Sequence, residues 1–337
     1  MRKTGLFLAS IVLSATLWAE LPEKKGLDVI NRANAEAYIG FLASDALEGR
    51  EAGFRGGRIA GEYIVSNLKT MGIEPLFESY YQPFEAYNKE RQKKGRFQVH
   101  PDSIAKLKQG VHQKLSMNNI LGKIEGKNPN EYVIIGAHYD HLGFDPMLDG
   151  DRVYNGADDN ASGVSAVLQV AKAFLATGVQ PERTVIFAFW DGEEKGLLGS
   201  KYFVQTFSEM DKVKGYLNYD MIGRNKDESK PMHVVYFYTE AHPVFGDWLK
   251  NDIKKYGLNL TPDYRPWDKP VGGSDNASFA LLDIPVIWYH TDGHPDYHMP
   301  SDHVEKINWN KIVDITKASF PVSYTHLRAH ETVLDLV

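Results

Sequence analysis

The sequence predicts an α/β fold with a mostly parallel central sheet flanked by helices on both faces. Five short, mostly apolar runs indicate strands buried on both faces: residues 132–137, 184–190, 213–219, 233–238 and 285–289. Between the first two runs, residues 162–177 carry apolar side chains at helical spacing, and Gly178 follows them. A strand, a helix and a strand in this order predict right-handed crossovers, which place helices over the sheet.

The composition is typical of a soluble globular protein. Of 337 residues, 43% are hydrophobic and 24% are charged, which is enough for one large domain. The formal net charge of −6 argues against a nucleic-acid partner, because such proteins usually carry a basic excess. The chain has no cysteine, which excludes disulfide bonds, thiolate metal sites and a cysteine nucleophile.

The N-terminal residues indicate export. Arg2 and Lys3 precede an apolar stretch that is too short to span a bilayer, and Ala19 suits a cleavage point. We therefore predict a signal peptide at residues 1–19 and a periplasmic or secreted protein. No cysteine follows the stretch and no later segment is long and apolar enough to cross a membrane, so we expect no membrane anchor.

The next 301 residues, 20–320, are predicted to form a single domain. Within it, residues 80–114 are polar and aromatic with little periodicity, so we interpret them as an irregular insert or lid. Residues 311–320 have the pattern of an amphipathic helix. The chain from Pro321 onwards does not continue that pattern and resembles translated vector sequence, so residues 321–337 are interpreted as a non-native tail.

Five residues of types that bind metals gather at the ends of the predicted strands and in adjoining loops: His138, Asp159, Glu194, Asp220 and His298. Ligands of open α/β sheets bind outside the carboxyl ends of the strands. Each residue alone could be a helix cap or a loop residue, but their joint placement favours one site. Two histidines and three carboxylates without thiolates suit one or two zinc ions, or similar divalent metals such as manganese or cobalt.

Five motifs carry a resemblance to a known family: GAHYDHLG, NGADDNASG, DGEEKGLLGS, NYDMIGR and DYHMPSD. Over residues 34–320 the chain resembles the secreted bacterial leucyl aminopeptidase and glutamate carboxypeptidase family, peptidase family M28, whose members use two zinc ions. The resemblance implies a zinc-dependent exopeptidase-like fold for the predicted domain. It also implies that Asp159 bridges the two ions and is followed by a cis peptide to Asn160.

The resemblance further implies a role for each remaining site residue. His138 and Asp220 would complete one zinc site, and Glu194 and His298 the other. Glu193 would be the general base, which takes a proton from a water bridging the ions and passes it to the leaving amine. Asp140 would orient His138, and Tyr297 would stabilise the oxyanion.

The expected activity is hydrolysis of the N-terminal peptide bond of peptides with a free N-terminus, where one ion can hold the free α-amine. Three alternatives stay open: a one-zinc glutaminyl cyclase, a carboxypeptidase for acidic dipeptides, and a catalytically inactive receptor-like protein. The carboxypeptidase would need a basic pocket that the sequence does not locate. Neither the preferred N-terminal residue nor the oligomeric state follows from the sequence.

Several polar residues near these motifs have no role in the family pattern. Loop or core positions are expected for four histidines: His141, His290, His294 and His303. Ser274 and Asp275 lie in a loop that also resembles one beside the family's site; two interpretations stay open, that they line the substrate pocket or that they form a plain turn.

Overall fold

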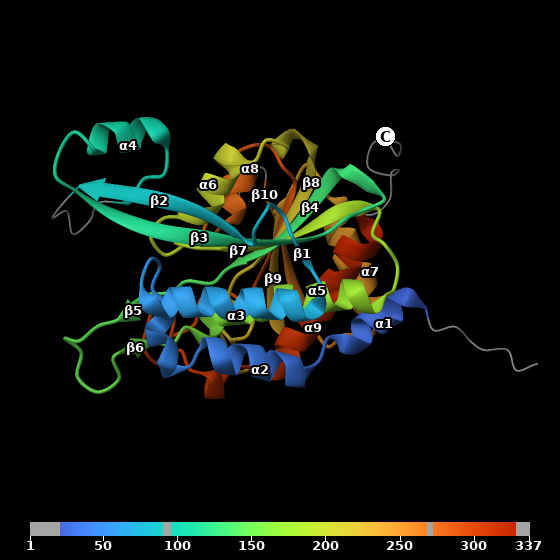
Figure 1. Ribbon diagram of the computed structural model, residues 1–337. Coiled ribbons are helices and arrows are strands. Elements are labelled where there is room, and N and C mark those ends of the chain that lie inside the picture. Colours follow the sequence, from blue (N-terminus) through green and yellow to red (C-terminus); the bar gives the residue numbers. More distant parts are fainter. Residues whose placement is uncertain (1–20, 90–95, 268–271, 328–337) are drawn as a thin grey trace, which may run out of the picture.

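The computed structural model describes residues 21–89, 96–267 and 272–327, which form a mixed central sheet with helices on both faces (Figure 1). The order of strands within these ranges is β1-β3-β7-β4-β8-β11-β9-β10, and β2 pairs with β3. Their bounds are β1 (Glu74–Pro75), β2 (Tyr81–Lys89), β3 (His112–Ile124), β4 (Asn128–His138), β7 (Arg183–Trp190), β8 (Val213–Tyr219), β9 (His233–Thr239), β10 (Thr261–Trp267) and β11 (Val286–His290). A separate short ribbon consists of β5 (Gly143–Phe144) and β6 (Val153–Tyr154).

The predicted α/β class is confirmed, although the sheet is less parallel than expected. β7, β4, β8 and β11 run parallel to one another and form its centre. β3 pairs antiparallel with β7 on one side, and β9 pairs antiparallel with β11 on the other. The carboxyl ends of the four central strands therefore lie at one edge of the sheet, where ligands of such sheets bind.

Helices cover the two faces unequally. One face of the sheet carries the larger of two hydrophobic cores. It packs against α1 (Pro22–Val29), α2 (Arg32–Leu42), α3 (Arg55–Met71), α5 (Gly163–Ala176), α7 (Val244–Lys255) and α9 (Trp309–Pro321). The other face packs against α6 (Leu198–Thr206) and α8 (Asn276–Ala280), which lie above the sheet in Figure 1. No helix in the described part of the chain has both the length and the apolar character needed to cross a membrane.

Strand β7 shows how an apolar run separates the two cores. Alternate side chains of a strand point to opposite faces. Val185, Phe187 and Phe189 belong to the larger core, whereas Ile186 and Trp190 lie in the smaller one. Because both faces are covered, nearly every residue of β7 must be apolar, and this explains the unbroken run in the sequence.

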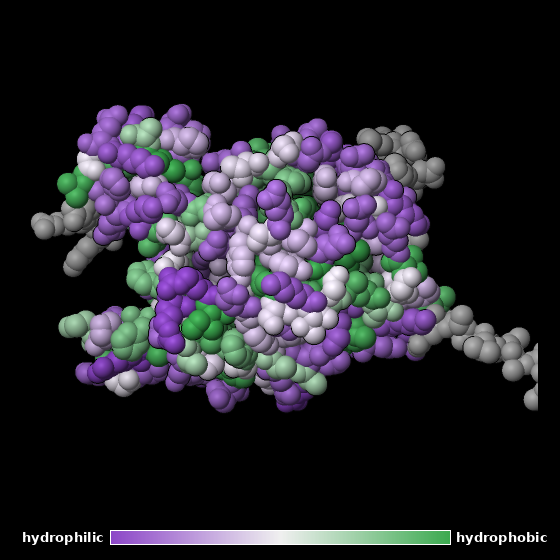
Figure 2. Space-filling model, in the orientation of Figure 1, coloured by the Kyte–Doolittle hydropathy of each residue, from purple (hydrophilic) through white to green (hydrophobic). Residues whose placement is uncertain are grey.

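The interpretation of residues 80–114 as irregular is wrong in its secondary structure. β2 pairs antiparallel with β3 from Tyr81–Ile120 to Lys89–His112, and α4 (Pro101–Leu107) follows β2 along the chain. We call β2 and residues 96–117, which include α4, the arm. The arm extends beyond the rest of the sheet in Figure 1. Figure 2 shows a notch in the outline of the molecule between the arm and the region of β5 and β6.

The C-terminal helix also continues further than the sequence predicts. After α9, a π-helical turn runs over Val322–His326, and Tyr324 stacks on Phe320 with ring centroids 5.2 Å apart. Val322, Tyr324 and Leu327 are buried in the larger core. The expected break at Pro321 is therefore wrong, while the non-native origin of residues 321–337 stays a prediction. Residues 328–337 and the predicted signal peptide lie outside the described ranges.

We predict that Tyr324→Ala lowers the free energy of unfolding by about 3–5 kcal/mol, because it leaves a cavity beside Phe174 and Phe320. Chemical denaturation followed by circular dichroism measures the change. The control is Asn310→Ala on the exposed side of α9, which we expect to stay within about 0.5 kcal/mol. Equal stability of the two variants would contradict the packing of this turn into the core.

Candidate metal centre

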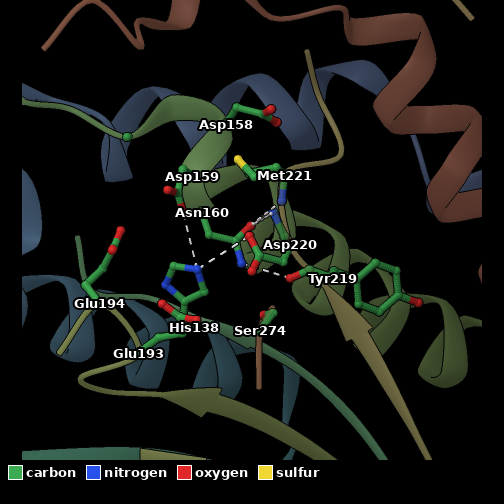
Figure 3. Close-up of polar contacts among 12 residues, drawn as sticks. His138, Asp158, Asp159, Asn160, Glu193, Glu194, Tyr219, Asp220, Met221 and Ser274 are labelled. Atoms are coloured by element: carbon green, nitrogen blue, oxygen red, sulfur yellow. Dashed lines mark hydrogen bonds and ion pairs between the residues drawn. The ribbon is translucent and has the colours of Figure 1, made fainter. Parts of the chain in front are cut away.

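The predicted site residues come together at the carboxyl ends of the central strands. His138 is the last residue of β4, Asp220 follows β8, and Glu193 and Glu194 lie in the turn after β7. Asp159 comes from the loop before α5, and His298 comes from the loop after β11. Figure 3 shows the His138 ring between the carboxylates of Asp159 and Asp220, with Glu193 and Glu194 on the other side.

One group consists of His138, Asp159 and Asp220, all of which are buried. The Nε2 atom of His138 lies 3.3 Å from Oδ1 of Asp159 and 3.5 Å from Oδ1 of Asp220. Among the described residues, this nitrogen has no hydrogen-bond partner although it is buried. A buried imidazole nitrogen without a partner between two carboxylates is the arrangement that a cation would satisfy.

A second group forms on the other oxygen of Asp159. Its Oδ2 atom lies 3.2 Å from Nε2 of His298, and that nitrogen lies 3.1 Å from Oε2 of Glu194. His298 adopts a positive φ of 57°, which is uncommon for a residue other than glycine. The single carboxylate of Asp159 thus faces both groups, one with each oxygen.

The spacing within both groups fits metal coordination. Two ligand atoms that each lie about 2.0–2.1 Å from one zinc ion, at the tetrahedral angle, are about 3.3–3.4 Å apart. The four separations above range from 3.1 to 3.5 Å. The imidazole and carboxylate donors are also those that zinc accepts in catalytic sites.

His141 is a site residue that the sequence analysis missed, since we expected it in a loop or core role. It is buried, and its Nδ1 lies 2.7 Å from Oε1 of Glu194 and 3.8 Å from Oδ2 of Asp159. These three residues also form a possible metal-binding group. A separation of 2.7 Å is a hydrogen-bond length, so the ring of His141 binds the carboxylate of Glu194.

Asp140 lies beside His138 but differs in detail from its expected role. Its carboxylate oxygen is 3.7 Å from Nδ1 of His138, whereas its main-chain carbonyl lies 3.3 Å from that nitrogen. The Oδ1 atom of Asp140 accepts a hydrogen bond of 3.0 Å from the main-chain N–H of Glu193. Asp140 therefore holds the imidazole through its carbonyl and the turn of Glu193 through its carboxylate.

Burial and charge act in opposite directions on the site's ionisable groups in the metal-free chain. Burial disfavours protonation of His138, but Asp220 and Glu193 outweigh it and raise the pKa of His138 well above its ordinary value. Burial also disfavours protonation of His298, but hydrogen bonds to Asp159 and Glu194 outweigh burial and raise the pKa of His298 to about 10. Burial and the neighbouring carboxylates raise the pKa of Glu193 well above that of a free glutamate.

A fully buried arginine holds the loops of the site together. The guanidinium of Arg50 donates to the main-chain carbonyl oxygens of Leu42, Tyr139, Asn155, Gly156 and Asp159 at 2.5–3.4 Å. Burial lowers its pKa to about 10, while the charges of Asp159 and Asp302 oppose that shift. The sequence analysis assigned no role to Arg50.

The loop that carries Asp159 is fixed from both sides. Oδ2 of Asp302 accepts hydrogen bonds from the main-chain N–H groups of Asp158 and Asp159, and the peptide between Asp159 and Asn160 is cis, as the resemblance implied. A side chain at Gly156 would lie 2.1 Å from the carbonyl of Asp159 and 2.6 Å from the ring of His141. Glycine is therefore required where the loop passes both residues.

The remaining polar residues of the sequence analysis take varied positions. Tyr297 is 43% exposed, and its ring stacks on His298 with centroids 3.9 Å apart. Asp275 is buried, and desolvation raises its pKa to about 7; it is one of the charges that act on Glu193. The other histidines bind polar atoms around the two groups: His290 the main-chain carbonyl of Asp220, His294 the carboxylate of Asp158, and His303 that of Asp151.

Comparison with known proteins gives a consistent set of similarities. The model of peptidase family M28 matches residues 119–322, more than half of the chain. Leupeptin-inactivating enzyme 1 of Streptomyces exfoliatus is 34% identical over 170 residues, which cover 50% of this chain and 34% of that enzyme. The chain thus spans about a third of the length of this relative.

Two solved structures share the fold. The LapA aminopeptidase of Legionella pneumophila has a TM-score of 0.65 at 22% identity, over 98% of this chain and 80% of that one. BSAP, a zinc aminopeptidase from Bacillus subtilis, has a TM-score of 0.67 at 17% identity, over 90% of this chain and 96% of that one.

We predict that zinc uptake at pH 7 releases protons from His138 and His298, because only the neutral imidazole binds metal. The pKa of each ring is raised in the metal-free chain, so each ring keeps its proton to a higher pH than a free imidazole does. The apparent zinc affinity should therefore rise with pH up to about 10. Calorimetric titration in two buffers of different ionisation enthalpy counts the protons, and a binding heat that is the same in both buffers would contradict the prediction.

We predict that His141→Ala weakens zinc binding by about 10–100-fold, because the carboxylate of Glu194 loses the hydrogen bond that orients it. Competition with a chelator of known affinity measures the change. His303→Ala is the control, since that ring is partly exposed and binds Asp151 away from the site. Equal affinities of the two variants would show that Glu194 does not depend on His141.

Proposed function

The chain belongs to peptidase family M28, and on this premise we propose that it is an aminopeptidase, which removes N-terminal residues from peptides with the help of two zinc ions. The observation that carries the proposal is the position of Asp159, whose two oxygens face two separate groups of donors. The names of the similar LapA and BSAP aminopeptidases support the same reaction class.

In this proposal His138, Asp159 and Asp220 hold one ion, and Asp159, Glu194 and His298 hold the other. When bound, the ions supply Lewis-acid activation of water and of the scissile carbonyl group. Asp140 positions His138 through its main-chain carbonyl, and His141 positions Glu194. Other divalent metals would also fit these donors.

Glu193 is the proposed general base. Its turn is held by the hydrogen bond from its main-chain N–H to Asp140, and its side chain borders the cavity beside the donor groups. It takes a proton from the attacking water and passes it to the leaving amine, so that one residue serves both halves of the reaction. The half-exposed Tyr297 borders the same cavity, and its hydroxyl is the proposed donor to the oxyanion.

The geometry supports this activity over two of the alternatives. A glutaminyl cyclase with one zinc would not need two donor groups that share Asp159. A catalytically inactive relative would not need Glu193 beside a complete set of donors. We also propose that the enzyme acts in the periplasm or outside the cell, based on the signal-like sequence of residues 1–19.

We predict that Glu193→Gln lowers kcat by about 10²–10⁴-fold while zinc content and thermal stability stay near wild type, because the amide cannot accept the proton. The assay uses a panel of aminoacyl-p-nitroanilides with zinc-loaded protein, with and without chelator. The control is Glu209→Gln, which lies in the turn before β8 and pairs with Lys212. Wild-type protein that is folded and zinc-loaded but hydrolyses none of the panel would overturn the proposed function.

A further inference from the structure

A cavity of about 550 Å³ opens beside the donor groups. Glu193, Glu194 and His298 line one part of it, and Arg96, Lys195 and Lys201 line another. Its volume lies within the range of about 300–1,000 Å³ that is usual for small-molecule pockets. The cavity therefore places three basic side chains next to the proposed reaction centre.

Two of these basic groups form no ion pair with a carboxylate among the described residues. Lys195 forms an ion pair with Glu51 at 2.9 Å. The ammonium of Lys201 instead donates to the main-chain carbonyl of Gly196 at 2.8 Å, and Arg96 forms no ion pair within the described ranges. Lys201 and Arg96 are thus left to act on whatever enters the cavity.

The two cations are also close enough to affect each other. Burial lowers the pKa of Lys201 and the neighbouring charge of Arg96 lowers it further, whereas the charges of Asp275 and Glu193 oppose that shift. Two cations that share a partly buried cavity repel each other, and an anion between them relieves that repulsion. Lys201 extends from α6 and Arg96 from the arm, so the two walls of the cavity come from separate elements.

We propose that this cavity is a substrate subsite in which Lys201 and Arg96 bind a carboxylate of the peptide. The inference rests on the proposed function and adds a substrate class to it: peptides with a carboxylate near the scissile bond. That carboxylate comes either from the C-terminus of a short peptide or from an acidic side chain. Both sources offer the planar group that arginine and lysine bind through charge-assisted hydrogen bonds.

The test compares matched substrates that differ only in one carboxylate, and the two dipeptide pairs carry the N-terminal residue that wild type prefers. The first pair is a dipeptide as free acid and as C-terminal amide. The second pair is a dipeptide amide with aspartate or asparagine in second place, and the third is an anilide of glutamate or glutamine. We expect kcat/KM to be about tenfold higher, or more, for the acidic member of one pair, which identifies the source.

The variants are Lys201→Gln and Arg96→Gln, with Lys254→Gln on the exposed side of α7 as control. We expect each cavity variant to reduce the acidic preference by about tenfold, and the control to keep it. No preference in any pair, or a preference that survives in both cavity variants, would overturn the subsite.

A binding measurement separates failure of the subsite from failure of the proposed function. Calorimetry with zinc-loaded Glu193→Gln measures the affinity for the same free-acid, amide, aspartate and asparagine peptides without turnover. Selective binding of the acidic members that is lost when Lys201→Gln is added supports the subsite even if wild type hydrolyses none of the substrates. Equal binding of both members of every pair overturns it even if the aminopeptidase activity is present.

Discussion

Buried negative charge is the constraint on which the architecture of this site depends. The ends of the central strands bring together the carboxyl groups of Asp140, Asp159, Asp191, Glu193, Glu194, Asp220 and Asp275. Carboxylates this close and this poorly hydrated are unfavourable unless cations or hydrogen-bond donors compensate them. Arg50 supplies one fixed positive charge, and the imidazoles supply others in the metal-free chain. Metal ions would replace the protons on those rings with a larger charge held at the same place.

The central strands could be predicted from the sequence because their environment leaves one kind of side chain possible. β7 and most of β4 and β8 are buried on both faces, so each reads as a mostly apolar run. β2 lacks that signal, since exposed Pro83 and Glu85 alternate with buried Phe84 and Ala86, and proline within a run argues against a strand. Its pairing with β3 depends on tertiary contacts that residue periodicity does not record.

Some residues of the site could also be predicted from the sequence, and others could not. The five proposed ligands could be predicted because their residue types recur at strand ends within motifs that resemble a family. Arg50 and His141 could not, because their roles depend on burial: one lies in a charged, glycine-rich loop and the other follows a ligand motif by a few residues. Nothing local to either residue tells whether the surrounding chain will close over it.

The arm gives the protein two regions that can change independently. Arg96 and Phe97 line the cavity from the arm, whereas the proposed metal ligands come from strand ends and their loops. Substitutions in the arm can therefore alter which peptides enter without moving any atom that takes part in bond cleavage. Evolution, or a protein engineer, could change the substrate preference of such an enzyme by substitutions in one peripheral hairpin. The catalytic residues would stay the same.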